Sequence, residues 1–332
     1  VQVALGHASD AVKTLSPAAK NSDDVQLLGM IGVAAAQTGD LSTANRYLGD
    51  AVKRQPDNAM LRTQLGVTKV ALGETDEGID DLERAAQQDP EALRPEIALF
   101  AAYMRDKEFD KALEIADSLQ KKHPDKPVGF DFAGAAYIAK NQLDAANTAL
   151  LKARELHPGE PFACRALANL AVRNGNVDGA IQYIQEILKA NPKDIPAYVD
   201  LAELQGREGH ADQMQATLGE AIKQDPDNLA ARLTLARLML LTGKYREALD
   251  SIDPVLTKNP TNAALLEVAG RAELGLKNTD SAVSTFKTLV SAQPQAGAAH
   301  RYLAQAYADS GNLDSALPEA QQAVDLNDKD TE

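Results

Sequence analysis

The sequence contains no tryptophan, a single cysteine and few aromatic residues, which together make up 4% of its 332 residues. One cysteine, Cys164, excludes an internal disulfide framework. Alanine and leucine are frequent, and a low aromatic content suits thin layers of packed helices better than sheets or a bulky core. We therefore expect an all-α protein.

Long hydrophobic runs and an excess of positive charge are also missing. No stretch approaches the roughly 18 uninterrupted apolar residues of a membrane-spanning helix, so we expect no transmembrane segment in this sequence. The 34 Lys and Arg residues stand against 48 Asp and Glu residues, which gives a formal net charge of −14. That charge disfavours general binding to nucleic acid or to an anionic membrane, and its simplest role is solubility.

Residue patterns typical of catalysis or metal binding are absent as well. We find no nucleophile beside a base, no glycine-rich phosphate loop, and no His or Cys cluster at metal-ligand spacing. The histidines are scattered, and His123 and His157 directly precede prolines, where a position near a helix C-terminus is the ordinary explanation. The sequence therefore predicts no enzyme, no metal and no cofactor, and Cys164 is interpreted as a packing residue.

The chain begins with Val1, Gln2 and Val3, without Met and without a basic and then apolar leader. We interpret it as a segment of a longer polypeptide. A signal peptide or a lipid anchor would then belong to the missing part.

Prolines mark a repeat of 34 residues through most of the chain, as 90 minus 56 and 294 minus 260 show. The series is Pro56, Pro90, Pro124, Pro158, Pro192, Pro226, Pro260 and Pro294. If each proline stands two residues before the end of a unit, nine units fill residues 25–330. They begin at Val25, Ala59, Leu93, Pro127, Pro161, Ile195, Leu229, Ala263 and Gly297. Within residues 1–24, Gly6 and Ala11 repeat the spacing of Gly243 and Ala248, which predicts a partial unit consisting of a second helix.

Four positions of the unit predict a pair of closely packed helices. The eighth residue is small in eight of nine units, and the twentieth is alanine in seven, so two helices can approach closely there. The fifteenth residue is often glycine, which tolerates a positive φ and ends the first helix. The eighteenth is usually Asp, which complements the dipole at the start of the second helix.

Two prolines fall inside predicted second helices. Pro254 lies six residues after Ala248, and Pro17 lies six residues after Ala11. Because proline removes a backbone hydrogen bond, we expect each to kink its helix or to end it early. The simpler interpretation is a bend on a solvent-facing helix, and the alternative is a hinge or a docking point.

The small eighth residue, the alanine at the twentieth and the terminal proline together resemble the tetratricopeptide (TPR) repeat, over residues 25–330. This resemblance implies a right-handed α-solenoid superhelix of stacked helix-turn-helix hairpins, with the first helices on the concave side. It further implies a non-enzymatic scaffold that binds a peptide or a partner protein in its groove.

By the same resemblance, groove residues stand at positions 2, 5, 6, 9, 12 and 13 of each unit. The early units place apolar side chains there, namely Met60, Val67, Val70, Met104 and Ile138. The later units place Arg165, Asn169, Arg173, Arg207, Arg237, Arg271 and Arg301. Because guanidinium groups pair with carboxylates and phosphates, these arginines predict an anion-attracting stripe. Asp200, Glu203 and Glu267 lie in the same rows and weaken it, and pairing of the arginines with neighbouring acids is the alternative.

Four strings resemble one bacterial group, the PEP-CTERM system TPR-repeat lipoproteins. They are residues 25–29 (VQLLG), 61–66 (LRTQLG), 78–83 (GIDDLE) and 229–233 (LAARL). The resemblance implies export to the periplasm of a Gram-negative bacterium, a lipid anchor in the missing part, and a scaffold role in exopolysaccharide production and protein sorting. The alternatives are a cytosolic adaptor, and the recognition arm of a larger enzyme whose catalytic domain lies elsewhere.

Overall fold

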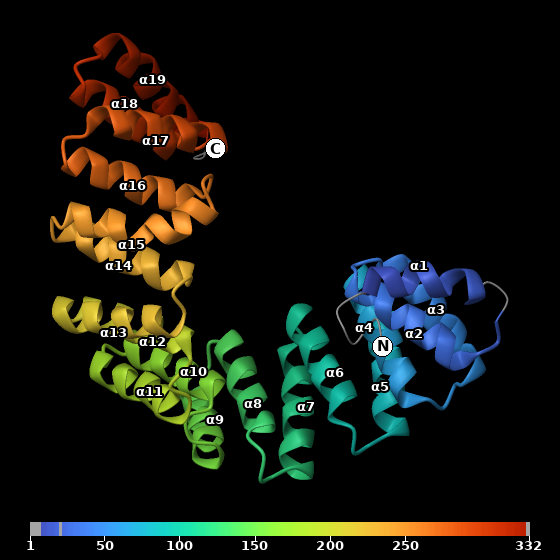
Figure 1. Cartoon of the computed structure of the whole chain (residues 1–332). Coiled ribbons are helices and arrows are strands. Elements are labelled where there is room, and N and C mark those ends of the chain that lie inside the picture. The colour runs from blue at the N-terminus through green and yellow to red at the C-terminus, as the bar shows by residue number, and fades with distance from the viewer. Residues whose placement is uncertain (1–7, 20–21, 330–332) are drawn as a thin grey trace. The chain divides into compact units, whose positions relative to one another are not determined.

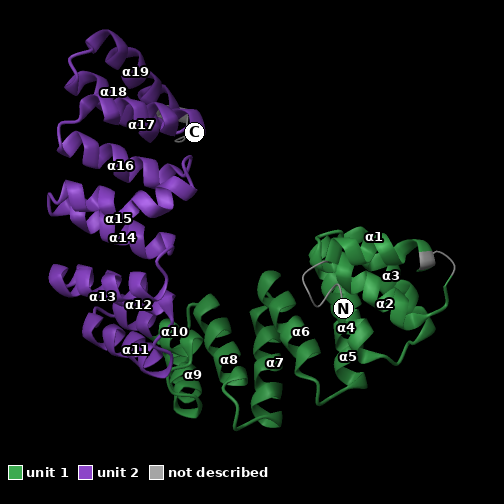
Figure 2. Ribbon diagram, in the orientation of Figure 1, with its two compact units in different colours: residues 1–167 green, residues 168–332 purple. Residues whose placement is uncertain are grey.

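A computed structural model describes residues 8–19 and 22–329 of the chain. Within these residues it contains nineteen helices and no strand, which confirms the predicted all-α class (Figure 1). The chain divides into two compact units, unit 1 (residues 1–167) and unit 2 (residues 168–332), which are described separately below (Figure 2).

The helices alternate between a first and a second helix of each repeat. The first helices are α2 (Val25–Gln37), α4 (Ala59–Leu72), α6 (Leu93–Arg105), α8 (Val128–Ala139), α10 (Pro161–Arg173), α12 (Ile195–Arg207), α14 (Leu229–Leu241), α16 (Ala263–Gly275) and α18 (Gly297–Asp309). The second helices are α1 (Ala8–Ala19), α3 (Leu41–Arg54), α5 (Thr75–Gln88), α7 (Phe109–Lys122), α9 (Leu143–Leu156), α11 (Val177–Ala190), α13 (Ala211–Gln224), α15 (Tyr245–Lys258), α17 (Thr279–Ala292) and α19 (Leu313–Lys329). Ala11 is buried in α1, whereas Gly6 lies outside the described residues.

A left-handed residue at position 15 ends the first helix in all nine repeats. Six of these residues are glycines with φ between 74° and 89°, as predicted. In the other three repeats, Lys107, Asn141 and Lys277 adopt φ values of 61°, 58° and 62°. The next residue then donates its backbone N–H to a carbonyl five residues back, as Glu74 does to Lys69 at 3.0 Å. This is the Schellman closure, which satisfies carbonyl groups at the helix end.

Lys107 and Lys277 adopt a conformation that is unfavourable for a residue with a Cβ atom. We expect Lys107→Gly or Lys277→Gly to raise the free energy of unfolding by about 1 kcal/mol each, since glycine adopts positive φ without that penalty. Urea unfolding followed by circular dichroism measures the change. The control is the reverse substitution at the same turn position, Gly73→Ala, which should lower stability by a similar amount. Equal stability of all three variants and the parent would contradict this account.

Small residues at positions 8 and 20 allow α4 and α5 to touch through their backbones. A Cβ atom built on Gly66 would lie 2.8 Å from the carbonyl oxygen of Gly78, and one built on Gly78 would lie 2.8 Å from that of Gly66. Phe100 is the large exception at position 8, and its ring stacks on Phe132 with centroids 3.9 Å apart. The predicted close approach at these two positions is therefore confirmed for this pair of helices.

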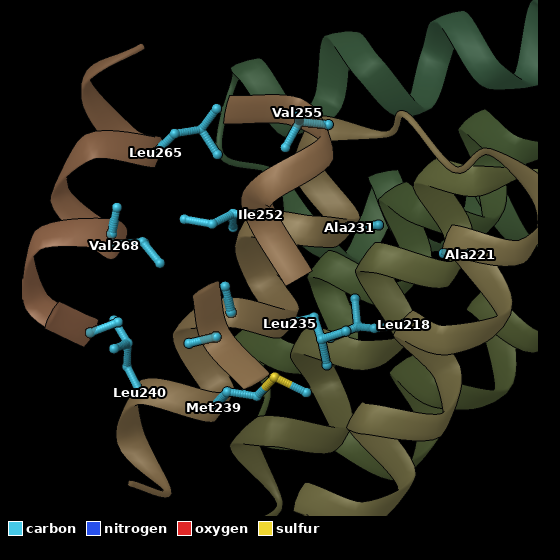
Figure 3. Close-up of a cluster of buried hydrophobic side chains, with 14 of the residues drawn as sticks. Leu218, Ala221, Ala231, Leu235, Met239, Leu240, Ile252, Val255, Leu265 and Val268 are labelled. Carbon is cyan, nitrogen blue, oxygen red and sulfur yellow. The ribbon is translucent and has the colours of Figure 1, made fainter. Parts of the chain in front are cut away.

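The hydrophobic core is shared between neighbouring repeats. In unit 2, one cluster of buried side chains joins helices α12 to α16, and Leu218, Leu235, Ile252 and Leu265 lie within it (Figure 3). In this cluster, the second helices α13 and α15 contribute to a core that the next first helix completes. This arrangement is expected of repeats that cannot bury an apolar face alone.

Pro254 does not end its helix early, so that part of the expectation is wrong, whereas the kink stays a prediction. Helix α15 has 14 residues, which is the length of every other second helix from α3 to α17. Pro254 is exposed, but Ile252 and Val255 on either side of it are buried and hold the helix against its neighbours. The side chain of Asn259 also donates to the carbonyl of Val255 at 3.0 Å, just beyond the helix end. Pro17 likewise lies inside α1, which continues to Ala19.

Polar side chains at position 4 of several first helices connect consecutive repeats. They reach the carbonyl oxygen of the repeat proline in the preceding repeat: Arg62 to Pro56 at 2.8 Å, Tyr198 to Pro192 at 3.2 Å, Arg232 to Pro226 at 2.5 Å and His300 to Pro294 at 3.1 Å. A carbonyl in the turn between two helices has no partner within a helix, so these side chains satisfy its capacity to accept a hydrogen bond. The polar residues at position 4 therefore help to hold consecutive repeats together.

A buried ion-pair network surrounds Asp81 between α4 and α5. Its carboxylate lies 2.9 Å from Arg62 Nη1 and 2.9 Å from Lys69 Nζ, and the Asp81 side chain is 8% exposed. Glu77 lies 3.3 Å from Lys69 on the outer side. Burial alone lowers the pKa of Lys69, but Asp81 and Glu77 outweigh this and raise that pKa above its ordinary range. Lys69 is therefore charged, and Asp81 is the shared partner of two cations.

Candidate functional site

Exposed apolar side chains gather on the first helices of unit 1. We define the apolar patch as Met30 of α2, Met60 and Val67 of α4, and Ile97 of α6. Their exposed fractions are 47%, 62%, 43% and 41%. All four stand at positions where the TPR resemblance places groove residues, although only Met60 and Val67 were among the sequence candidates. Large apolar side chains exposed on first helices make this patch a candidate interaction surface.

A depression of about 580 Å³ lies beside this patch, between α2 and α4. Val25, Met30 and Val33 line it from α2, and Met60 and Leu61 line it from α4. The polar groups at its edge are Gln26, Gln55, Asn58, Gln64 and Arg94. A mainly apolar hollow with a few polar groups at the edge suits an apolar side chain of a ligand.

A second depression of about 560 Å³ adjoins the first, between α4 and α6. The two share Met60, Gln64 and Arg94, and the second adds Thr63 and Glu91 among others. Arg94 is exposed and forms no hydrogen bond or ion pair with any described residue. A guanidinium group is therefore available between two hollows.

The remaining apolar candidates contribute more to packing than to an open surface. Val70 is half-buried, and its methyl group would lie 2.6 Å from a Cβ atom on Gly78. Met104 is half-buried too, and it packs against the cluster that contains Leu82 and Phe100. Ile138 is also half-buried. All three occupy position 12, so this position faces the second helix more than the groove.

The predicted arginine row is divided between the two units. Arg165 lies in unit 1 and is half-buried, while Asn169 and Arg173 lie in unit 2 and are exposed. Arg165 and Arg173 each interact with another residue. Arg207 and Arg237 are exposed and make no ion pair with a described residue, so they are the candidates in unit 2 for an anionic ligand.

The last two arginines of the row are held by neighbouring side chains. Arg271 forms an ion pair with Glu267 at 3.0 Å, which is the alternative that the sequence left open. The hydroxyl of Tyr302 donates to the same Glu267 at 3.1 Å, and Arg301 lies over the Tyr302 ring at 4.5 Å from its centroid. These contacts fix both guanidinium groups on the surface of unit 2.

Asp131 of α8 is a titratable group whose environment disfavours its charged form. It stands at position 5, and its Oδ1 atom is buried without a hydrogen-bond partner among the described residues. Burial, with a smaller contribution from the negative charge of Glu160, raises the pKa of Asp131 to about 7. Glu160 is itself occupied at the start of α10, where it accepts from the backbone N–H of Ala163 at 2.8 Å.

Within residues 8–19 and 22–329, no three His, Cys, Asp or Glu side chains come close enough together to hold a metal ion. None of the described helices is both long and apolar enough to cross a membrane. Cys164 is fully buried in α10, and His123 and His157 cap the C-termini of α7 and α9, as the sequence predicted.

The sequence matches family models described as tetratricopeptide repeats. One matches residues 69–129, 137–204 and 207–272, and another matches residues 30–92 and 267–331. No curated protein matches the chain.

Several solved structures of the protein MamA are similar to about half of the chain. One, from Desulfovibrio magneticus RS-1, is 16% identical and covers 50% of this chain and 94% of its own, with a TM-score of 0.46. Another, of MamA MSR-1, is 24% identical and covers 50% of this chain and 96% of its own, with a TM-score of 0.43.

Proposed function

The chain belongs to the tetratricopeptide repeat family, and we propose that it is a non-enzymatic scaffold that binds a peptide segment of a partner protein on the first helices of unit 1. The observation that carries this proposal is the apolar patch of Met30, Met60, Val67 and Ile97 beside two adjoining depressions. Covering such side chains removes apolar surface from water, which is the main driving force of protein association.

The chemistry of the two depressions suggests what the peptide carries. Met30 and Met60 have flexible, polarisable side chains that adapt to apolar residues of different shapes. Arg94 offers an unpaired guanidinium group between the two hollows, where it can form a charge-assisted hydrogen bond with a carboxylate. The best ligand is therefore a peptide with a large apolar side chain close to an acidic residue.

A displayed library of random peptides tests this proposal. Peptides enriched on the chain should contain a large apolar residue near Asp or Glu. The Kd of such a peptide, measured by fluorescence anisotropy, should rise about tenfold or more in Met60→Asp, since an apolar contact is lost and a like charge opposes the ligand. The matched control is Leu241→Asp on α14, which changes an 81% exposed leucine in unit 2 and should leave the Kd unchanged.

Two outcomes would count against the binding surface. One is an equal loss of affinity in Met60→Asp and Leu241→Asp. The other is enrichment of peptides without any apolar anchor. Circular dichroism of both variants confirms that an exposed substitution has left the helices intact.

We also propose that the protein works in the cell envelope of a Gram-negative bacterium, as a lipid-anchored scaffold for exopolysaccharide assembly and protein sorting. Support comes from the four strings that resemble PEP-CTERM system TPR-repeat lipoproteins. The alternatives are a cytosolic adaptor and the recognition arm of a larger enzyme. Fractionation of cells that express the full-length protein tests the location, and recovery in the cytosol would reject the envelope role.

A further inference from the structure

The last helix of unit 2, α19, carries an apolar stripe on its exposed surface. Leu313, Leu317 and Val324 are 68%, 74% and 53% exposed. Their spacing of four and then seven residues places them on one face of the helix, and exposed Ala320 lies between them. Helix α19 packs against α18 at the C-terminal end of unit 2 (Figure 1).

The same positions are covered in α15, two repeats earlier. Tyr245, Leu249 and Leu256 correspond to Leu313, Leu317 and Val324. All three are half-buried and pack against a cluster that includes Leu265 and Val268 of the next first helix, α16. A Cβ atom on Gly275 of α16 would lie 2.5 Å from the Tyr245 ring. In α15, the positions that correspond to the stripe are therefore those against which the next first helix packs.

The same packing is present in α17, in the repeat before that of α19. Val283 and Val290 of α17 correspond to Leu317 and Val324, and they pack against the cluster that contains Leu303 and Ala306 of α18. The face of α19 is therefore continuous with an interface that already recurs within unit 2. The occupant that fits it is a helix with apolar residues at the spacing of a first helix.

Helix α19 does not turn at the place where the other second helices do. The second helices α3 to α17 end at position 30, two residues before the repeat proline. In the ninth repeat that proline is replaced by Asp328, and α19 continues to Lys329 with 17 residues. Helix α19 therefore continues past the position at which the other second helices turn.

The charges near the stripe favour a different protein over a second copy of this chain as the occupant of this face. Asp314 and Asp325 are exposed near the two ends of the stripe, and the sequence as a whole carries a net charge of −14. Pairing of two α19 helices, parallel or antiparallel, would bring these carboxylates together and would be opposed by repulsion. A helix with basic residues at both ends meets no such cost.

We propose that the face of α19 formed by Leu313, Leu317 and Val324 binds a basic amphipathic helix of another protein, which docks as a first helix docks on α15 and α17. This interface is separate from the apolar patch of unit 1. It gives the protein a second attachment point, independent of the peptide-binding function proposed above.

The probe is a helical peptide with the sequence of residues 263–276, held helical by a side-chain crosslink on the face opposite to Leu265 and Val268. In the basic version, Glu267 and Glu273 are replaced by Lys, and the acidic version keeps both glutamates. Fluorescence anisotropy with the whole chain should show tighter binding of the basic peptide. Leu317→Lys should weaken that binding about tenfold or more, because it removes an apolar contact and opposes the charge. Leu241→Lys on α14 is the matched control, since it changes an 81% exposed leucine of the same unit away from this face, and it should have no effect.

Several results would overturn the proposal. Equal affinity for the basic and acidic peptides would show that charge does not select the helix that binds this face. Unchanged affinity in Leu317→Lys, or a loss of the same size in Leu241→Lys, would show that the peptide binds elsewhere. Sedimentation of the chain alone as a dimer that Leu317→Lys dissociates would show that a second copy occupies this face.

Discussion

Replacing Asp81 with alanine is expected to lower the free energy of unfolding by about 3–5 kcal/mol, because the change leaves a buried charge without its partner. Arg62 has a side chain that is only 10% exposed, and Asp81 is its partner at 2.9 Å. Lys69 loses the same carboxylate at 2.9 Å and keeps only Glu77. Urea unfolding followed by circular dichroism measures the loss, read at the transition that involves unit 1.

The matched control is Asp80→Ala, which removes an exposed carboxylate from the neighbouring position of the same helix. Its effect should stay within about 0.5 kcal/mol, as for most surface substitutions. A double variant, Arg62→Met with Asp81→Leu, replaces both charges by apolar side chains and should recover most of the stability. If Asp81→Ala were as harmless as Asp80→Ala, the network would not be a buried one in solution.

Asp131→Asn is expected to stabilise the protein at pH 8 and to leave its stability unchanged near pH 4. The pKa of Asp131 is about 7 in the folded state, against an ordinary value of 3.8, so the folded state binds this proton more tightly than the unfolded state. The carboxylate therefore costs stability increasingly from pH 4 to pH 7, and the full cost is present above pH 7. Because part of the group remains in solvent, we expect a gain of about 1–2 kcal/mol at pH 8 from its removal.

Thermal or urea unfolding of Asp131→Asn and the parent at both pH values provides this measurement. Asp144→Asn is the control, since Asp144 is an exposed Asp in the first turn of α9. It should give a slight loss at pH 8, because its charge complements the helix dipole. A gain from Asp131→Asn that is the same at pH 4 and at pH 8 would show that packing, and not ionisation, is responsible.

Most of the fold could be predicted from the sequence because its determinants are local. The proline spacing gave the phase, and eight of the nine first helices begin at the residues that this phase marks; α8 begins one residue later, after Pro127. Glycine at position 15 predicted the turn, since a positive φ is a property of one residue. Lys107 and Lys277 adopt the same turn against their own preference, which shows that the packing of the two helices decides there.

The candidate site was predicted only in part, because burial depends on neighbours in space. Met60 and Val67 are exposed, whereas Val70 and Met104 pack between first and second helices. Arg94 was overlooked, although it stands at a groove position, because its significance comes from two depressions that no single helix reveals.

The contacts at position 4 were missed for a related reason. Arg62 and Arg232 stand at a position that is apolar in other repeats, such as Leu28 and Leu266, and this departure was a usable signal. Their partner is a carbonyl of the preceding repeat, which becomes evident only when the units are stacked.

The extensive contacts in the structure join helices that are neighbours or next neighbours in chain order. Bringing such helices together closes only short loops, so little chain entropy is lost before contacts form. Folding can therefore start at any repeat and spread outward, and the N-terminal hairpins can form while later ones are still being synthesised on the ribosome.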